Sequence, residues 1–436
     1  MKKNICLCTL LGIAVTASGA VSPVIEDFSL TQDRTTRIVT LSYRLTTAPA
    51  VVTLSVETNA GNDVWVKLPT EVWTASGDDL GTLQQPSETP RTFTWRPFRV
   101  WPKGTVPASD CRAVVTAWAT NAPPDYMVVD PTGARKPHYY VTAEDVPGGV
   151  TDNRYKSQYI LMRRIHAAGV EWRMGTAEAD GENKPGWARP HPVVLTSDFY
   201  IGVYETTQGQ YVQFSGGANP SKFGSSYADH AYRPVENLTA TGYDPINAGL
   251  LTTIGTLASQ TGVAFTLPTE AQWEFAARGG MGSTFPDGRN MGSTAQSNAH
   301  LDAIAVWNKE KAEVSNLQTA VVGTKEPNAY GLYDVIGNVW EICRDGWKQT
   351  YSDNSPVVDP CIPDSASVAS GGEIFTACKN GTAASPGYHS RRGGSYELQN
   401  LDYLRVCGRF ACEWHDKWWG AAHGCGFRLC APCEAR

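Results

Sequence analysis

The chain has 436 residues, of which 42% are hydrophobic and 18% are charged. These proportions are typical of an ordered globular protein and exclude a disordered or fibrous chain. The formal net charge of -6 excludes the dense positive field that binding to a nucleic-acid backbone requires.

The first twenty residues have the three parts of a secretory signal peptide. Two lysines precede an apolar run, Ile5–Val15, and the small residues Ser18, Gly19 and Ala20 follow it. The run is too short to cross a bilayer, which takes about 20 apolar residues, and the sequence holds no second such run. We therefore expect residues 1–20 to be a signal peptide cut near Ala20, export to the periplasm or the extracellular space, and no transmembrane segment. A buried N-terminal strand or a membrane anchor is the alternative.

Short segments of alternating polarity fill residues 21–130. They are Ile38–Leu45, Val51–Glu57, Val64–Leu68, Thr92–Arg96 and Ala113–Trp118. Turn-forming residues separate them about every ten residues without a helical stripe, so the sequence predicts an all-β sandwich domain. Because this domain contains no constellation of titratable residues, we interpret it as a spacer or a docking module. Residues 131–154 are rich in proline and glycine and are predicted as a linker or a partly ordered wrap.

A pattern of short strands and short helices begins at residue 155 and continues to residue 436. Two strands of a hairpin are predicted at Tyr159–Arg164 and Val170–Met174, and helices at Glu205–Phe214 and Ala240–Ser259. The clearest helix begins at Thr269. Thr269 and Gln272 have the spacing of a capping box, and Gly279 ends the helix.

Most cysteines lie near the C-terminus. They are Cys343, Cys361, Cys378, Cys407, Cys412, Cys425, Cys430 and Cys433. In an exported protein such a cluster indicates disulfides, although the sequence leaves their pairing open. A zinc or other metal cluster made by His415, His423, Cys425, Cys430 and Cys433 is an alternative. Cys111 opens an apolar run and is predicted to be a buried thiol.

Several longer strings of residues in fixed order carry the functional signal, because the sequence has no phosphate-binding loop, serine-hydrolase elbow or helical zinc motif. The strings are Phe199–Tyr211, Asn219–Phe223, Pro234–Asn237, Leu267–Gly280, Asn328–Glu341, Arg392–Tyr396 and Gly426–Arg428. Together they closely resemble the formylglycine-generating enzyme family, also called sulfatase-modifying factors, from about residue 155 to 430. The resemblance implies an α+β domain with the irregular fold related to C-type lectins, here preceded by the all-β sandwich.

The resemblance also implies bound calcium. Asp334 and Glu341 correspond to calcium-binding side chains of the family, and the carbonyl groups of Gly337 and Val339 complete that site. Carboxylate and carbonyl oxygens are the ligands that a hard cation prefers. The alternative is that Asp334 and Glu341 are ordinary turn and strand acids.

The family's oxidase reaction converts a substrate cysteine to formylglycine with oxygen and a copper(I) ion held by two cysteines. Thiolates suit this soft ion. In this sequence the two copper-binding positions are Leu398 and Tyr403, or Asn400 and Arg405 when they are counted back from Gly426–Arg428. Neither pair supplies a thiolate, so the resemblance implies a site that lacks the oxidase chemistry. Cys407 and Cys412 keep the spacing of the pair further along the chain, and as displaced copper ligands beside Ser395 they would give an active oxidase instead.

Several aromatic residues could line a ligand pocket in place of the copper site. The pocket residues that we predict are Trp340, Ser395, Leu398, Tyr403, Trp414, Trp418 and Trp419. We expect a calcium-stabilised binding or scaffold module for a peptide, a glycan or a surface protein. The alternative is an active oxidase that acts on the family's usual substrate motif, Cys-x-Pro-x-Arg, in a sulfatase.

Overall fold

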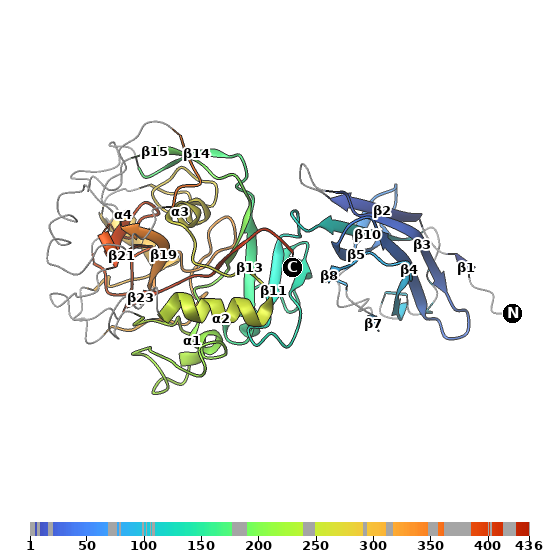
Figure 1. Ribbon diagram of the computed structural model, residues 1–436, viewed down its shortest axis with the longest axis horizontal. Helices are drawn as coiled ribbons and strands as arrows, with labels where there is room; N and C mark the ends of the chain where they lie inside the picture. The colour runs from blue at the N-terminus through green and yellow to red at the C-terminus, as the bar shows by residue number, and fades with distance from the viewer. Residues whose placement is uncertain are drawn as a thin grey trace. The chain divides into compact units, whose positions relative to one another are not determined.

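The computed structural model divides the chain into two compact units (Figure 1). The first unit holds residues 1–128, 136–150 and 433–436, and the second holds residues 129–135 and 151–432. The structure describes residues 5–6, 9–15, 21–68, 76–77, 80–97, 100–101, 103–104, 106, 110–176, 190–238, 249–290, 294–310, 317–347, 356–361, 385–399, 401, 403–412 and 424–435.

The first unit is a sandwich of two sheets. One sheet has the order β1 (Ile5–Cys6), β3 (Val24–Gln32), β4 (Val39–Thr46), β9 (Arg91–Trp95) and β7 (Ser76–Gly77). The other has the order β2 (Thr9–Val15), β10 (Cys111–Ala119), β5 (Ala50–Asn59) and β6 (Trp65–Lys67), and β8 (Leu83–Gln84) also pairs with β5. The predicted all-β region is therefore confirmed.

Alternation of side chains explains why these segments form a sandwich. Every second residue of β4 is buried, and the buried set includes Leu41, Tyr43 and Leu45. These side chains meet buried residues of β5 and β10 in one apolar core. Cys111 lies in this core as a buried thiol, as the sequence predicts.

Part of the proline- and glycine-rich segment belongs to the first unit. β12 (His138–Tyr140) pairs with β11 (Tyr126–Val129), and a 3-10 helix follows at Ala143–Asp145. Asp145 accepts hydrogen bonds from Thr142 at the start of this helix and from Lys67 of β6. These contacts hold the segment on the sandwich.

The second unit contains several small sheets. β13 (Ile160–Ile165), β16 (Phe199–Gly202) and β24 (Cys430–Pro432) are antiparallel neighbours. A second sheet has the order β14 (Glu171–Met174), β15 (His191–Val194) and β20 (Val357–Val358), and β17 (Ala305–Val306) pairs with β18 (Ile336–Gly337). A further sheet has the order β22 (Arg409–Cys412), β21 (Ser385–Arg392), β19 (Trp340–Trp347) and β23 (Cys425–Gly426).

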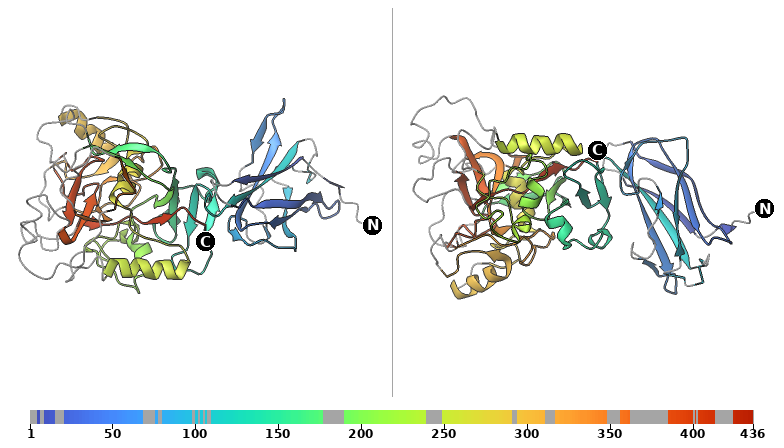
Figure 2. Two further views of the ribbon diagram at one scale, coloured as in Figure 1. Left: turned by 45° about the horizontal axis from the view of Figure 1, so that its top comes forward. Right: turned by 90° about the horizontal axis from the view of Figure 1, so that it is seen from below.

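The described helices of this unit are short. They are α1 (Gln208–Tyr211), α2 (Leu251–Thr261), α3 (Glu270–Arg278) and α4 (Thr294–Ile304), with 3-10 helices at Asn153–Lys156 and His230–Tyr232. Figure 2 shows α2 at the outside of the unit in both views. No helix within the described ranges is long and apolar enough to cross a membrane. Small sheets with few short helices make the whole chain α+β, as predicted.

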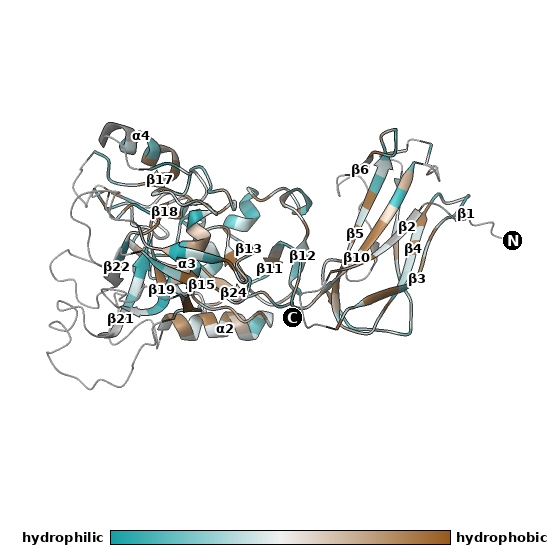
Figure 3. Ribbon diagram, turned by 90° about the horizontal axis from the view of Figure 1, so that it is seen from above, coloured by the Kyte–Doolittle hydropathy of each residue, from teal (hydrophilic) through white to brown (hydrophobic). Residues whose placement is uncertain are grey.

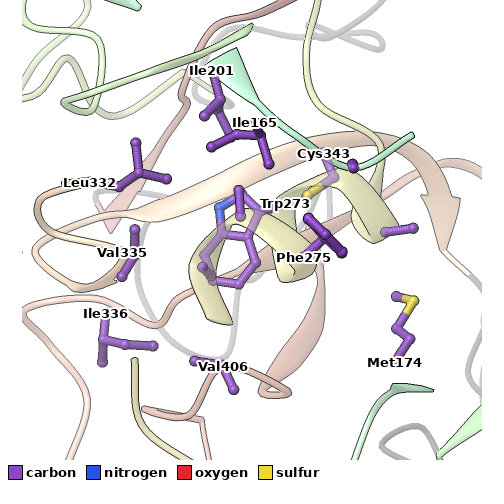
Figure 4. Close-up of a cluster of buried hydrophobic side chains, with 14 of the residues drawn as sticks. Ile165, Met174, Ile201, Trp273, Phe275, Leu332, Val335, Ile336, Cys343 and Val406 are labelled. Carbon is purple, nitrogen blue, oxygen red and sulfur yellow. The ribbon is translucent and has the colours of Figure 1, made fainter. Parts of the chain in front are cut away.

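The helix predicted at Thr269 is confirmed. Thr269 accepts a hydrogen bond from the Gln272 amide, and the Gln272 side chain accepts one from the Thr269 amide. The helix ends at Gly279 in the left-handed conformation. Its buried face carries Trp273 to the centre of the apolar core of the unit, where Val335, Ile336 and Val406 surround the ring (Figure 4).

Three predicted elements differ from the structure. β13 and β14 are strands, but the predicted hairpin between them is wrong, because β13 pairs with β16 and β14 with β15. The Asp198 carboxylate accepts the amides of Ala167 and Ala168 and redirects the chain between these strands. α1 is shorter than predicted, because the capping Thr207 starts it late. α2 begins at Leu251, and the residues predicted as its start, 240–248, lie outside the described ranges.

Candidate functional site

The sheet of β19, β21, β22 and β23 brings together the sequence strings that are far apart in the chain. In its register Trp340 lies opposite Cys425, and Glu341 lies opposite both Gly426 and Arg392. The strings Asn328–Glu341, Arg392–Tyr396 and Gly426–Arg428 therefore meet at one end of this sheet.

Buried ion pairs join α3 to this sheet. Arg392 of β21 contacts Glu270 at 2.8 Å and Glu274 at 2.6 Å, and Arg409 of β22 contacts Glu270 at 2.6 Å. All four side chains are at most 1% exposed. Because unpaired charges are costly in an apolar interior, these pairs fix the strand ends from which the candidate site extends.

Leu398 and Tyr403, at the positions predicted for the copper ligands, follow a tight turn after β21. Gly394 in this turn has a φ of +76°, and a side chain there would meet Leu404 and Leu398. Leu398 packs partly buried against the apolar core. The Tyr403 ring contacts Phe410 and Trp340 edge-on, with ring centroids 5.5 and 6.2 Å apart.

We call Trp340, Tyr403 and Phe410 the aromatic cluster. The Arg391 guanidinium lies over the rings of Trp340 and Phe410, at 4.9 and 5.1 Å from their centroids. Trp340 is only 4% exposed, whereas Tyr403, Phe410 and Arg391 are partly exposed and can offer apolar and polar contacts. The predicted pocket residues Trp340, Leu398 and Tyr403 are thus close together, whereas Trp414, Trp418 and Trp419 lie outside the described residues.

The thiol of Cys407 lies in a buried, charged environment. Cys407 is 3% exposed, and burial raises the pKa of its thiol to about 11, with Glu274 acting in the same direction. Copper(I) binds the thiolate, which this environment disfavours. Cys412 is the last residue of β22, and its side chain lies outside the described part. Neither Leu398 nor Tyr403 offers a soft donor, so these two positions do not fit copper.

Ser395 and the carboxylate of Glu397 lie beside Gly424. Ser395 is fully buried, and a side chain at Gly424 would come within 3.0 Å of Ser395 and 3.2 Å of Glu397. Glu397 accepts a hydrogen bond from the Tyr396 hydroxyl at 2.9 Å. The sequence analysis did not single out Glu397.

Glu236 is a second carboxylate that the sequence analysis missed, although it lies inside the string Pro234–Asn237. Its Oε1 accepts the Phe223 amide at 3.0 Å, and its Oε2 has no hydrogen-bond partner among the described residues. Burial raises the pKa of Glu236 to about 7, and the charge of Glu397 acts in the same direction. The sequence signal that could have found Glu236 is an acidic residue inside a family string. The structure adds that this residue is fully buried.

Asp334 fits the predicted role of a cation ligand. Its Oδ2 accepts the Gly323 amide at 2.6 Å, and its Oδ1 has no hydrogen-bond partner in the described ranges. Burial raises the pKa of this carboxyl to about 6. Glu205, which the sequence analysis did not select, is fully buried and accepts the Asn338 side chain and the Val339 amide.

Glu341 does not fit the same role. Both of its oxygens accept hydrogen bonds from Arg428, and Oε2 also accepts the Trp273 ring N–H at 2.6 Å. Within the described residues no group of three or more His, Cys, Asp or Glu side chains is placed to hold a metal ion. Calcium binding by Asp334, Gly337, Val339 and Glu341 stays a prediction that only Asp334 supports.

The described cysteines do not support the predicted disulfides. Cys111, Cys343, Cys361, Cys407, Cys425, Cys430 and Cys433 are all thiols. Arg391 donates a hydrogen bond to the Cys425 sulfur at 3.0 Å. Cys378 and the histidines of the alternative metal cluster, His415 and His423, lie outside the described residues.

Comparison with known proteins agrees with this arrangement. The sulfatase-modifying factor enzyme 1-like domain matches residues 161–431, which is more than half of the chain. This chain belongs to the sulfatase-modifying factor family. The match contains the whole sheet of β19, β21, β22 and β23 and all residues of the candidate site.

Individual relatives within the sulfatase-modifying factor family match shorter segments. The formylglycine-generating enzyme of Streptomyces coelicolor is 40% identical over 98 residues, which are 22% of this chain and 31% of that enzyme. The one from Thermomonospora curvata is 36% identical over 115 residues, 25% of this chain and 38% of the enzyme. The chain thus spans about a third of the length of these enzymes. The chaperone protein LppX of Paenibacillus barcinonensis is 33% identical over 182 residues, 34% of this chain and 63% of LppX.

Solved structures are similar to part of this chain. Treponema denticola variable protein 1 is 25% identical and covers 63% of this chain and 95% of its own, with a TM-score of 0.45. PvdO from Pseudomonas aeruginosa is 20% identical and covers 62% of this chain and 94% of its own, with a TM-score of 0.42.

Proposed function

We propose that this protein is an exported binding or scaffold module that lacks the oxidase activity of the formylglycine-generating enzymes. The observation that carries the proposal is the aromatic cluster. Tyr403 replaces a copper-binding thiol and packs against Trp340 and Phe410. Leu398 replaces the other thiol and packs against the core. A soft ion needs sulfur or nitrogen donors, and these two side chains supply none.

The same residues suit recognition. Aromatic rings present large, rigid surfaces at a low entropic cost, and the Arg391 guanidinium adds charge beside them. Peptides, glycans and surface proteins all offer groups that stack on such rings or accept hydrogen bonds from arginine. We therefore propose the aromatic cluster as the contact point for a partner of this kind.

An assay for formylglycine formation tests the loss of oxidase activity. The full chain is incubated with copper(I), oxygen and a peptide containing Cys-x-Pro-x-Arg, and the peptide mass is followed. We expect no change, whereas the Streptomyces coelicolor enzyme in the same buffer serves as the positive control. A mass loss at the substrate cysteine that disappears with Cys407→Ser would contradict the proposal and establish the oxidase.

A binding screen tests the recognition role. The labelled full chain is applied to arrays of immobilised glycans and peptides, and hits are measured again with Tyr403→Ala. We expect this substitution to weaken binding at least tenfold. Trp65→Ala, which removes an aromatic ring from the sandwich, is the matched control and should leave binding unchanged. Equal binding by the wild type and Tyr403→Ala would remove the aromatic cluster from the proposal.

A further inference from the structure

The N-terminal segment lies as an edge strand on the sandwich. β2 lies beside β10 (Figure 3). The two strands run parallel, and their paired residues extend from Thr9 opposite Arg112 to Val15 opposite Trp118. This pairing covers seven residues of β2. The strand that completes this sheet edge is thus part of the predicted signal peptide.

β2 lies at the edge of the sandwich, where Gly12, Ile13 and Ala14 are exposed. Gly12 lies opposite Val115, a fully buried core residue, so both positions lie on the same face of the sheet. A Cβ atom at Gly12 would lie 3.6 Å from the Cβ of Ile25 on the other sheet. Ile13, the next residue, is 43% exposed. Removal of β2 would therefore expose a row of backbone groups on β10 beside Val115.

Without residues 1–20, β3 and β10 would be the edge strands at this side of the sandwich, and they would not be equally protected. β3 has a bulge between Glu26 and Ser29, where Asp27 adopts a φ of +49°, and both Glu26 and Asp27 are acidic. Bulges and charges are devices that prevent an edge strand from pairing with another chain. β10 pairs with β2 and β5 in continuous register, and Arg112 is its only charged residue.

We propose that cleavage after export vacates the β10 edge, which then binds an extended strand of a partner protein in parallel orientation. The inference rests on the proposed export. The partner strand is uncharged, carries a small residue opposite Val115 and has apolar residues on either side of it, as Thr9–Val15 does. Strand addition to a sheet edge is a general mode of peptide recognition, in which main-chain hydrogen bonds supply affinity and alternate side chains supply specificity. The sandwich thereby becomes a docking module.

A peptide with the sequence of Thr9–Val15 and a charged tail is the probe. The full gene is expressed in a bacterium that exports the protein, and the mass of the purified product defines its N-terminus. Fluorescence anisotropy then measures binding of the peptide. We expect saturable binding to the cleaved protein.

Two backbone-modified peptides provide the matched control. One is N-methylated at Leu10, Gly12 and Ala14, and the other at Leu11 and Ile13. Amides of alternate residues point to opposite sides of a strand, so only one set can donate to β10. We expect one peptide to bind at least tenfold more weakly and the other within twofold of the parent. Equal affinity of the two would overturn the inference, because it would indicate non-specific apolar association.

The uncut chain separates this inference from the proposed export. Cell-free translation without membranes leaves residues 1–20 attached, so β2 occupies the edge and the peptide should not bind. Equal binding to the uncut and cleaved forms would contradict the proposed site. An exported product that retains residues 1–20 would refute cleavage and thus the vacated edge. A product that begins near Val21 but fails to bind would overturn the docking site alone.

Discussion

Two side chains, Leu398 and Tyr403, carry the proposed difference between this site and a copper oxidase. Leu398 packs on the core, and Tyr403 contributes a ring to the aromatic cluster. Both follow the turn at Gly394, where the chain bends too tightly for a side chain. Neither side chain offers the sulfur donor that the proposed family site would need.

Restoring the two sulfurs tests this residue-level account. We expect the double variant Leu398→Cys, Tyr403→Cys to bind one copper(I) ion, because two thiols would return to the family's ligand positions. Competition with a chromophoric copper(I) chelator measures the affinity of the variant and of the wild type, which should not compete. Competition by the wild type that Cys407→Ser abolishes would show that another thiol holds the ion.

The buried carboxyl of Asp334 predicts a pH dependence. Burial raises its pKa from 3.8 to about 6, so the folded state holds the proton more tightly than the unfolded state. The stability that the protonated carboxyl contributes is present below the unfolded pKa of 3.8 and is lost as the pH rises through the folded pKa of about 6. In EDTA at pH 7, Asp334→Asn should raise the free energy of unfolding by at most about 3 kcal/mol. Denaturant titrations should show this gain disappearing at pH 4.

If calcium binds the same carboxylate, the ionised Asp334 should stabilise the fold instead of destabilising it. A cation that binds only the folded state stabilises it by mass action. We therefore expect EDTA to lower the Tm of the wild type and calcium to restore it, whereas Asp334→Asn should respond to neither. A wild-type melt that EDTA leaves unchanged would remove calcium from the proposed function.

At the scale of elements, α3 and the sheet of β19, β21, β22 and β23 act as one assembly. The acids of α3 lie on its buried face, and the arginines that neutralise them come from β21 and β22, more than one hundred residues further along the chain. The Glu341–Arg428 pair joins β19 to the residues after β23 in the same way.

Breaking this assembly should cost much more than breaking a surface pair. Arg392→Leu removes a positive charge that neutralises the buried carboxylates of Glu270 and Glu274. We therefore expect the free energy of unfolding to fall by about 3 to 5 kcal/mol. The matched control is Arg44→Leu on β4, whose partners Glu26 and Glu88 are largely exposed, with an expected loss below about 1 kcal/mol. Urea titration measures both, and equal losses would contradict the role of Arg392.

At the scale of the whole molecule, the chain holds two units with separate apolar cores. Units with their own cores commonly unfold as separate cooperative transitions. We expect two transitions in calorimetry. Leu41→Ala should destabilise only the sandwich, and Leu332→Ala should destabilise only the second unit. We expect each substitution to lower the free energy of unfolding of its own unit by about 2 to 5 kcal/mol. A single transition that both substitutions shift equally would contradict this expectation.

The sequence by itself determined what depends on neighbours along the chain. The alternation around Leu41 and Val115 predicts the strands of the sandwich, and Thr269 with Gln272 predicts the start of α3. The family strings predicted the α+β fold and pointed to Leu398 and Tyr403, because the order and spacing of motifs can be read without knowing which residues are in contact.

Only the tertiary structure decided which distant groups meet. The partner strands of β13 and β14 depend on sheet register. The pairing of Glu341 with Arg428 and the burial of the Glu236 Oε2 atom depend on how distant segments pack. Segments far apart in the chain meet through long-range backbone hydrogen bonds and packing, and no local pattern encodes that choice. The position of β2 beside β10 is of the same kind, since the apolar run that predicts a signal peptide suits a sheet edge equally well.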